Sequence, residues 1–395
     1  MKLDSAARYR EHSGKDVNMA MKPIRAAVVG AGMISSIYLK NMVERFEILE
    51  ITDICSARMD SARKRAAEFG ITARSYREIL SDSTIEMIVN LTPVPSHEEI
   101  IRSALEAGKH VYTEKTMTGD YRSAKSLSRL AKAKGLFLGS APDTFLGAAQ
   151  QTARAAVDAG EIGEITSFAF ASNRDNSYLT SYYRFLNLPG GGVGYDYSVY
   201  YLTALVNLLG PVAQVASAVR APYQMHIDIN PASVTFGQPI PTPNESEISA
   251  VIRLENGICG TVHFNNDTIS KDQAFMAVYG TKGILYLPDP NAFGGDVRLL
   301  RGSSIPGGQP VMETLPCRHA FSDNSRGVGP ADMAWAIRQG RPCRASAETA
   351  CHVLETIDAI ITSGKENRFV DVHSRCERPA ALSRHSQSEE ACLID

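Results

Sequence analysis

The sequence predicts an α/β fold with two parts: an N-terminal Rossmann domain with a doubly wound parallel sheet, and a C-terminal α/β domain with a large open, mostly antiparallel sheet. A glycine-rich turn follows the first apolar segment. Short apolar runs then alternate with helical patterns in the first third of the chain, which is typical of a parallel sheet. Beyond that, longer strands follow one another with glycine turns between them. A length of 395 residues also favours two domains over one core.

The expected elements of the first part alternate regularly. Apolar runs indicate buried strands, and a glycine after a helical pattern marks the end of a helix. The expected strands are 24–29, 48–55, 87–91, 111–113 and 136–139, and the expected helices are 35–44, 60–69, 76–80, 97–107 and 121–134. We therefore expect a dinucleotide-binding domain over 22–143.

The pattern changes after residue 143, where we expect a second domain with a largely antiparallel sheet over 144–380. The expected strands are 164–172, 212–220, 246–254, 258–266, 273–280 and 283–287, and the expected helices are 148–159, 197–209 and 347–363. Segments 222–245 and 301–329 are rich in Pro, Gly and Ser and predict loops. The polar ends, 1–21 and 381–395, are expected to be a flexible extension and a flexible tail.

Composition excludes several classes of protein. A net charge of −2 gives no reason to expect nucleic acid or an anionic membrane as a partner. Seven cysteines, odd in number and without a C-x-x-C pair, argue against a disulfide framework or a zinc site and for a reducing compartment, hence the cytoplasm. No apolar run has the length of a membrane helix, and the first twenty residues lack the apolar core of a secretory signal.

The glycine-rich turn predicts a cradle for the phosphates of a dinucleotide. Gly30 permits a tight turn after the strand, and Gly32 lets the backbone approach the pyrophosphate. Met33 and Ile34 lead into the helix, whose N–H groups and dipole favour an anion. Ser35 occupies the third position, where glycine or alanine is usual. Because a strand precedes this glycine pair and a helix follows it, the pair indicates dinucleotide binding more strongly than a plain βα turn would.

The end of the second strand should hold the cofactor ribose, and two interpretations compete there. Asp53 has the spacing of a ribose-binding acid but lies within the expected strand. If the strand ends at Cys55, Ser56 and Arg58 reach the ribose instead. A hydroxyl and a guanidinium suit a 2′-phosphate, which favours NADP over NAD. If Arg58 is only a solvated surface charge, this preference disappears.

The nicotinamide side is expected where the fourth and fifth segments end. Thr92 and Pro93 follow a strand and open a helix, so they should border the cofactor. His97, near the start of that helix, is also expected among the cofactor-binding residues, and it is more easily explained as structural than as an acid or base. Glu114 and Lys115 follow a later strand of the same sheet, and a lysine there would place a fixed positive charge beside the nicotinamide.

Glycines 190–192 lead into an expected helix on the substrate side. Glycines allow a loop to pass close to a ligand. Asp196 and Tyr200, four residues apart, share one helix face and suit hydroxyl binding and proton transfer. The structural alternatives are that Asp196 caps the helix and that Tyr200 packs in the core. Lys115 would lower the pKa of Tyr200 from about 10 by favouring the phenolate. Arg174 and Tyr183 lie where side chains would contact a substrate.

These motifs in combination resemble the glucose-fructose oxidoreductase/inositol dehydrogenase (Gfo/Idh/MocA) family. The resemblance covers nearly all of residues 22–380 and rests on segments 30–34, 92–97, 107–115, 160–163 and 190–192. It implies that the Rossmann domain over 22–143 is followed by a substrate-binding and oligomerisation domain over 144–380, an α/β domain whose open sheet commonly builds homodimers or homotetramers.

The resemblance also implies roles for individual residues. Lys115 would contact the nicotinamide side and the substrate hydroxyl, Asp196 would bind substrate, and Tyr200 would be the acid/base. Thr116 stands where the family usually has proline, which restores a backbone N–H.

We therefore expect an NAD(P)-dependent oxidoreductase that transfers a hydride to or from a hydroxyl-bearing carbon of a sugar, polyol or sugar derivative, without a metal. Two alternatives stay open: a redox-neutral glycoside-processing enzyme with tightly bound NAD, and a non-enzymatic nucleotide-binding sensor.

Overall fold

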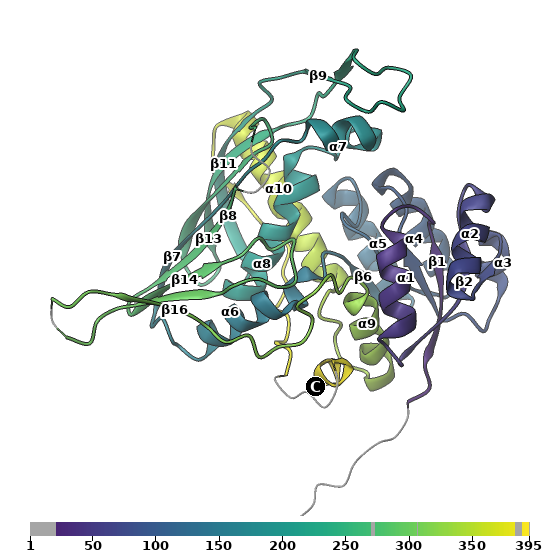
Figure 1. The fold of residues 1–395 in the computed structure, drawn as a ribbon, viewed down its shortest axis with the longest axis horizontal. Coiled ribbons are helices and arrows are strands. Elements are labelled where there is room, and N and C mark those ends of the chain that lie inside the picture. Colours follow the sequence, from purple (N-terminus) through teal and green to yellow (C-terminus); the bar gives the residue numbers. More distant parts are fainter. Residues whose placement is uncertain (1–20, 270–272, 306, 384–388, 395) are drawn as a thin grey trace, which may run out of the picture.

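Two sheets with different topologies form the molecule, which confirms the predicted fold class. The computed structural model describes residues 21–269, 273–305, 307–383 and 389–394, and the predicted extension at 1–20 lies outside them. In Figure 1 the smaller sheet lies on the right and the larger one on the left, with helices between them.

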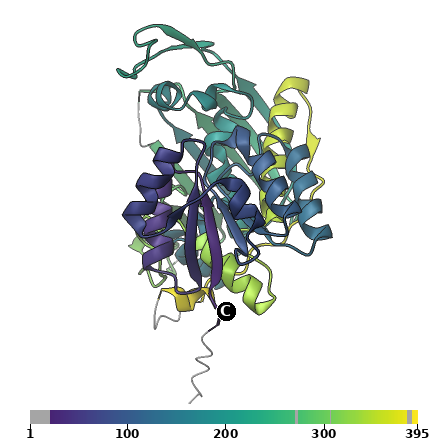
Figure 2. The same cartoon turned by 90° about the vertical axis from the view of Figure 1, so that its right-hand side faces the viewer.

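The smaller sheet is parallel and has the strand order β3-β2-β1-β4-β5-β6. Its strands are β1 (Ile24–Val29), β2 (Leu49–Cys55), β3 (Thr72–Ala73), β4 (Met87–Asn90), β5 (His110–Thr113) and β6 (Leu138–Ser140). Its helices are α1 (Ser35–Glu44), α2 (Met59–Phe69), α3 (Tyr76–Ser81), α4 (His97–Glu106) and α5 (Tyr121–Ala133). Helices cover both faces (Figure 2), which explains why the strands are continuous apolar runs. The strand order reverses between β1 and β4, and ligands of such sheets bind at the carboxyl ends of the strands there.

The larger sheet has nine strands in the order β16-β15-β14-β13-β7-β12-β11-β8-β17. They are β7 (Ile165–Asn173), β8 (Val212–Arg220), β11 (Glu247–Leu254), β12 (Cys259–Asn265), β13 (Gln273–Gly280), β14 (Gly283–Leu287), β15 (Arg298–Arg301), β16 (Val311–Thr314) and β17 (Val370–Asp371). Among the described strand pairs of this larger sheet, only β12 and β7 are parallel, and the other pairs are antiparallel.

One face of the larger sheet carries the second core. Helices α6 (Ala148–Asp158), α8 (Val199–Leu209) and α10 (Ala347–Glu366) lie on this face (Figure 1). Along β11, buried and exposed side chains alternate, with Ile248 and Ile252 buried and Val251 exposed. This alternation is that of a sheet covered on one face.

Several elements form where no helix or strand was predicted. They are α7 (Ser177–Tyr182), the hairpin β9 (Met225–Ile227) and β10 (Pro239–Pro241), strands β15 and β16, and α9 (Val328–Gln339). Helix α9 contains Gly329 and Pro330 near its start, so its own propensity is weak. Tertiary packing favours it: a side chain on Gly329 would meet the Tyr112 ring, and Met333 is fully buried.

The end of the described chain returns to the parallel sheet. Helix α9 packs on α1 and on the short 3-10 helix η5 (Glu390–Leu393). The Trp335 indole donates to Glu390 Oε1 at 3.0 Å, and Leu393 is fully buried. Residues 389–394 therefore differ from the flexible tail predicted over 381–395. The division of the chain at 143/144 stays a prediction. Among the described residues, no helix combines the length and the apolar character needed to cross a bilayer.

Candidate functional site

A cavity of about 1220 Å³ lies at the carboxyl ends of the parallel strands and reaches the larger sheet. Its lining includes the glycine-rich turn, the loop after β4, residues 114–116, Arg174 directly after β7, Tyr200 of α8 and Arg326 in the loop before α9. Single-ligand pockets usually measure about 300–1,000 Å³. This cavity is large enough for a dinucleotide together with a second small molecule.

The glycine-rich turn has the geometry of a phosphate cradle. Gly30 has φ +112°, and a Cβ there would lie 2.7 Å from the Leu91 carbonyl carbon. A Cβ on Gly32 would meet no atom within 4 Å, because this glycine faces the open cavity. The Ser35 hydroxyl donates to the Gly32 carbonyl at 2.6 Å and so fixes the start of α1. Met33 and Ile34 also line the cavity.

At the ribose end, the structure separates the two predicted interpretations. Asp53 is buried within β2, where it accepts hydrogen bonds from the Thr52 hydroxyl at 2.6 Å and from Arg74 at 3.5 Å. It does not line the cavity, whereas Ser56 and Arg58 do. Arg58 is exposed, and no carboxylate of the described residues forms an ion pair with it.

The loop after β4 is fixed from behind by His97. This side chain is fully buried and does not line the cavity, unlike Thr92 and Pro93. Its Nε2 lies 2.7 Å from the Thr92 carbonyl oxygen, and its Nδ1 lies 2.8 Å from that of Thr116. Burial lowers the pKa of His97. The histidine therefore joins two loops of the cavity wall, as a structural residue would.

Glu114 and Lys115 follow β5 and point in different directions. Glu114 turns toward α1, where its carboxylate accepts from the Tyr38 hydroxyl and from the Lys115 N–H, both at 2.8 Å. Lys115 Nζ donates to Asp196 Oδ1 and to the Asp196 carbonyl oxygen, both at 2.7 Å. Burial opposes the charge of Lys115, but the nearby Asp196 carboxylate raises its pKa above the usual value. The peptide bond between Lys115 and Thr116 is cis.

Tyr200 lies beside this ion pair. The centre of its ring is 5.4 Å from Lys115 Nζ, and the residue is 8% exposed. Burial raises the pKa of Tyr200, and the Lys115 cation offsets only part of this effect. The Lys115 cation lowers the pKa of Tyr200 as predicted, but the net direction is upward because the ring is buried and because the Glu114 carboxylate also raises this pKa.

The glycines before α8 serve protein packing. A Cβ on Gly191 would lie 2.2 Å from the Leu186 carbonyl oxygen, and one on Gly192 would lie 2.2 Å from the Glu245 carboxylate. The chain then forms a π-helical turn over Gly194–Ser198 before α8 begins. The close approach that requires these glycines is thus to other parts of the protein, although Gly190 and Gly191 also line the cavity.

The remaining predicted substrate contacts also face the cavity. The Arg174 guanidinium lies 3.9 Å from the centre of the Tyr197 ring. The Tyr183 hydroxyl lies 3.4 Å from Met33 Sδ, so it joins the α7 region to the glycine-rich turn. Sequence reasoning missed Arg326, which lines the same cavity from a segment predicted to be a loop. No spacing motif marks this arginine.

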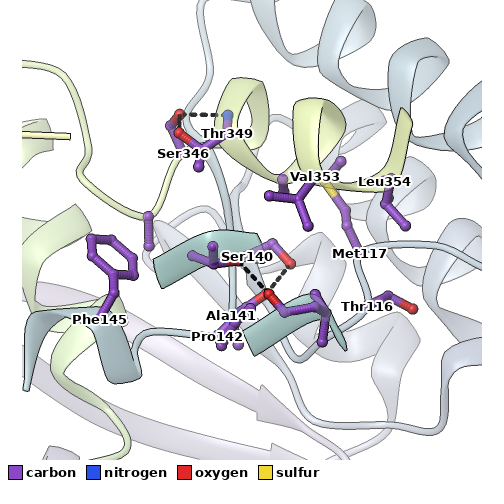
Figure 3. A pocket seen from close by; sticks show the side chains of 14 residues that line it. Thr116, Met117, Ser140, Ala141, Pro142, Phe145, Ser346, Thr349, Val353 and Leu354 are labelled. Carbon is purple, nitrogen blue, oxygen red and sulfur yellow. Dashed lines mark hydrogen bonds between the residues drawn. The ribbon is translucent and has the colours of Figure 1, made fainter. Parts of the chain in front are cut away.

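A second cavity, of about 10 Å³, lies behind the Lys115 loop. Figure 3 shows Thr116 and Met117 on one side and Val353 and Leu354 of α10 on the other. Its volume is at the limit for a single water, so it is a packing void under the loop. Within the described part of the chain, no three His, Cys, Asp or Glu side chains are arranged to hold a metal ion.

Two family models match the chain in succession. Residues 24–141 match the Gfo/Idh/MocA oxidoreductase family, NAD-binding Rossmann fold, and residues 150–286 match the Gfo/Idh/MocA C-terminal domain.

Individual proteins give more distant matches. An uncharacterized oxidoreductase of Schizosaccharomyces pombe is 29% identical over 52% of this chain and 57% of its own length, so this chain spans little more than half of that relative. The NADP(+)-dependent scyllo-inositol 2-dehydrogenase of Bacillus subtilis is 22% identical over 88% of this chain and 95% of its own length. Levoglucosan dehydrogenase in complex with NADH and L-sorbose has a TM-score of 0.77 at 20% identity, covering 90% of this chain and 100% of that chain. At such identity the last match shows the fold alone.

Proposed function

Because the chain belongs to the Gfo/Idh/MocA family of NAD-binding oxidoreductases, we propose that it moves a hydride between a nicotinamide cofactor and a hydroxyl-bearing carbon of a sugar, polyol or sugar derivative. One observation supports this most strongly: the Lys115–Asp196 ion pair and Tyr200 line the same cavity as the glycine-rich turn. A cation and a phenol thus share a space with a dinucleotide cradle.

The residues of the cradle fit a dinucleotide. Gly32 leaves room where any side chain would project into the cavity, and the N-terminus of α1 presents backbone N–H groups to a pyrophosphate. Thr92 and Pro93 would border the nicotinamide, which supplies the hydride acceptor or donor when bound.

Lys115 and Asp196 would orient the reacting hydroxyl. Lys115 stays protonated, since the neighbouring carboxylate favours its charged form, and it can donate to the substrate oxygen. That cation stabilises the negative charge that develops on the oxygen as its proton leaves. Asp196 accepts hydrogen bonds from neighbouring hydroxyls. Tyr200 would exchange the proton with the substrate oxygen as general base in oxidation and as general acid in reduction.

The ribose end supports a preference for NADP. Arg58 is exposed at the cavity wall, and Ser56 also lines the cavity. The Asp53 side chain is buried, and its carboxylate already accepts hydrogen bonds within the protein. We expect Arg58→Ala to weaken NADP binding by about tenfold or more, as loss of a charged hydrogen bond would, and to leave NAD binding unchanged. Titration of each cofactor by fluorescence measures both affinities. Arg63→Ala is the control, because this exposed arginine of α2 does not line the cavity. An unchanged NADP affinity would contradict this preference.

The proposed reaction is tested by absorbance of the reduced nicotinamide with a panel of sugars and polyols. Accumulation of reduced cofactor in proportion to the sugar supports a dehydrogenase. Release of an aglycone from a glycoside without reduced cofactor would instead identify the redox-neutral alternative. Tight cofactor binding with no turnover of any sugar would favour the sensor.

We also propose that copies of the chain associate through the outer face of the larger sheet. The side of this sheet opposite α6, α8 and α10 carries no helix of the described residues (Figure 1), and Val251 and Phe275 are exposed on it. Apolar side chains gathered on an open sheet face favour a homodimer or homotetramer.

A further inference from the structure

Two arginines that line the cavity have no carboxylate of the described residues within ion-pair distance. Of the three cations that line it beyond the ribose end, Lys115 is paired with Asp196. Arg174 and Arg326 form no ion pair with any carboxylate in the part of the chain that the structure describes. A partly buried guanidinium without a counterion is costly, because transfer from water is offset only by a partner. Such a cation in a binding cavity indicates an anionic ligand.

Arg326 is held rigidly by neutral groups. Its Nη2 donates to Asn291 Oδ1 at 2.7 Å and its Nη1 donates to Asn324 Oδ1 at 2.8 Å. These bonds use two of the five guanidinium N–H groups. Amide partners fix the plane of the guanidinium without pairing its charge directly, and the Asp143 and Glu114 carboxylates favour that charge only from beyond ion-pair distance. The side chain faces the cavity, and it is close enough to Tyr200 for its charge to favour the phenolate.

Arg174 approaches the same region from the end of β7. Its guanidinium stacks on the Tyr197 ring, and the centres of the Tyr197 and Tyr200 rings are 5.9 Å apart. Stacking holds the guanidinium by its face, so that its N–H edge stays available for a planar oxyanion. Arg174 and Arg326 thus reach the surroundings of Tyr200 from two different elements.

We propose that the substrate of this site carries an oxyanion, a carboxylate or a phosphate, and that Arg326 and Arg174 bind it while Lys115 and Tyr200 contact the reacting hydroxyl. The substrate class is then an acidic sugar or polyol. This inference rests on the proposed oxidoreductase function. It adds a selection against neutral sugars, whose hydroxyls would leave two partly buried guanidinium groups without an anion.

Matched substrates test this inference. Glucose, glucuronate and glucose 6-phosphate differ in the group at one carbon only, and kcat/KM is measured for each with saturating cofactor. We expect at least one anionic sugar to exceed glucose by about tenfold or more, as a charge-assisted hydrogen bond provides. The arm that responds, carboxylate or phosphate, identifies the oxyanion. Equal or better turnover of glucose would overturn the inference and leave the proposed function intact.

Arg326→Gln tests the residue itself. The ratio of anionic to neutral kcat/KM is expected to fall by about tenfold or more, with cofactor Kd unchanged as the sign of a folded cradle. Arg318→Gln, an exposed arginine of the same segment that does not line the cavity, is the matched control. An unchanged ratio, or a loss confined to cofactor affinity, would overturn the assignment of Arg326.

A binding measurement separates failure of this inference from failure of the proposed function. Calorimetric titration of glucuronate, glucose 6-phosphate and glucose into the protein–NADP complex needs no turnover. Tighter binding of an anionic sugar that is lost in Arg326→Gln supports the anion site even if no sugar is oxidised. Equal binding of all three, or none, overturns it.

Discussion

Lys115 lies beside a carboxylate, Asp196, and a phenol, Tyr200, which have different roles in proton transfer. Asp196 keeps the lysine charged through two contacts of 2.7 Å, so this lysine is an electrostatic group and not a base. Tyr200 can accept the proton of the substrate hydroxyl, but burial raises the pKa of this phenol. The Lys115 cation therefore polarises the substrate hydroxyl, and the Tyr200 phenol exchanges the proton with it.

The direction of the Tyr200 pKa predicts the pH dependence of oxidation. Oxidation needs the phenolate, and a phenol with a pKa above about 10 is almost entirely protonated at neutral pH. The value of kcat/KM for oxidation should therefore rise about tenfold per pH unit through the neutral range and keep rising beyond pH ~9, still below that pKa. Reduction, which uses the protonated phenol, should be flat over the same range.

Tyr200→Phe should remove this slope along with most of the activity. The ring and its packing are retained, so that unfolding is not the cause of the loss. Steady-state rates of both directions between pH 6 and 9 (roughly the range below the phenol pKa) measure the slopes. A plateau of the oxidation rate near neutral pH would show that another group accepts the proton.

At the scale of elements, substitutions of the two glycines in the turn between β1 and α1 are expected to have different effects. Gly32→Ala should fold normally, since a Cβ there meets nothing within 4 Å, but should weaken cofactor binding by about tenfold or more because the methyl group occupies the pyrophosphate space.

Gly30→Ala should lower the melting temperature as well, because its φ of +112° and the Leu91 carbonyl both exclude a side chain. Thermal unfolding and cofactor titration on both variants separate the two effects. Unaltered cofactor affinity in Gly32→Ala would contradict the cradle.

The elements also show what the sequence can and cannot predict. Strands β1, β2 and β4 could be predicted because continuous apolar runs and glycine stops are local signals. Helix α9 could not, since Gly329 and Pro330 disfavour it locally and only burial against Tyr112 and α1 makes it favourable. Arg326 was missed for the same reason: it reaches the cavity through a segment whose path is set by tertiary contacts.

At the site, Lys115 and Tyr200 were expected to act as a pair, and the structure places Lys115 Nζ 5.4 Å from the centre of the Tyr200 ring. The direct contact of Lys115 with Asp196 was not predicted. The net pKa of Tyr200 was predicted in the wrong direction. A sequence shows that a cation and a phenol are near in the fold, but the balance between burial and charge depends on the exposed fraction of the ring.

For the whole molecule, the bare face of the larger sheet predicts association. Light scattering should give a mass that is two or four times the chain mass of 42.9 kDa. Val251→Arg, on β11 of that face, should shift the protein toward monomer through unfavourable burial of charge. Arg253→Lys, exposed on the same strand, keeps the charge and should not change the mass. A wild-type mass of one chain at micromolar concentration would contradict this association.

Two functional parts of the molecule meet at Lys115: the cofactor cradle of the parallel sheet and the substrate residues of α8. The central claim, that this lysine serves hydride transfer and not cofactor binding, is tested by Lys115→Ala. Single-turnover absorbance of the reduced nicotinamide is measured beside cofactor Kd. We expect turnover to fall by about 10³-fold or more, as loss of a group that stabilises developing charge would cause, while cofactor affinity stays that of the wild type. An active Lys115→Ala protein would contradict the account.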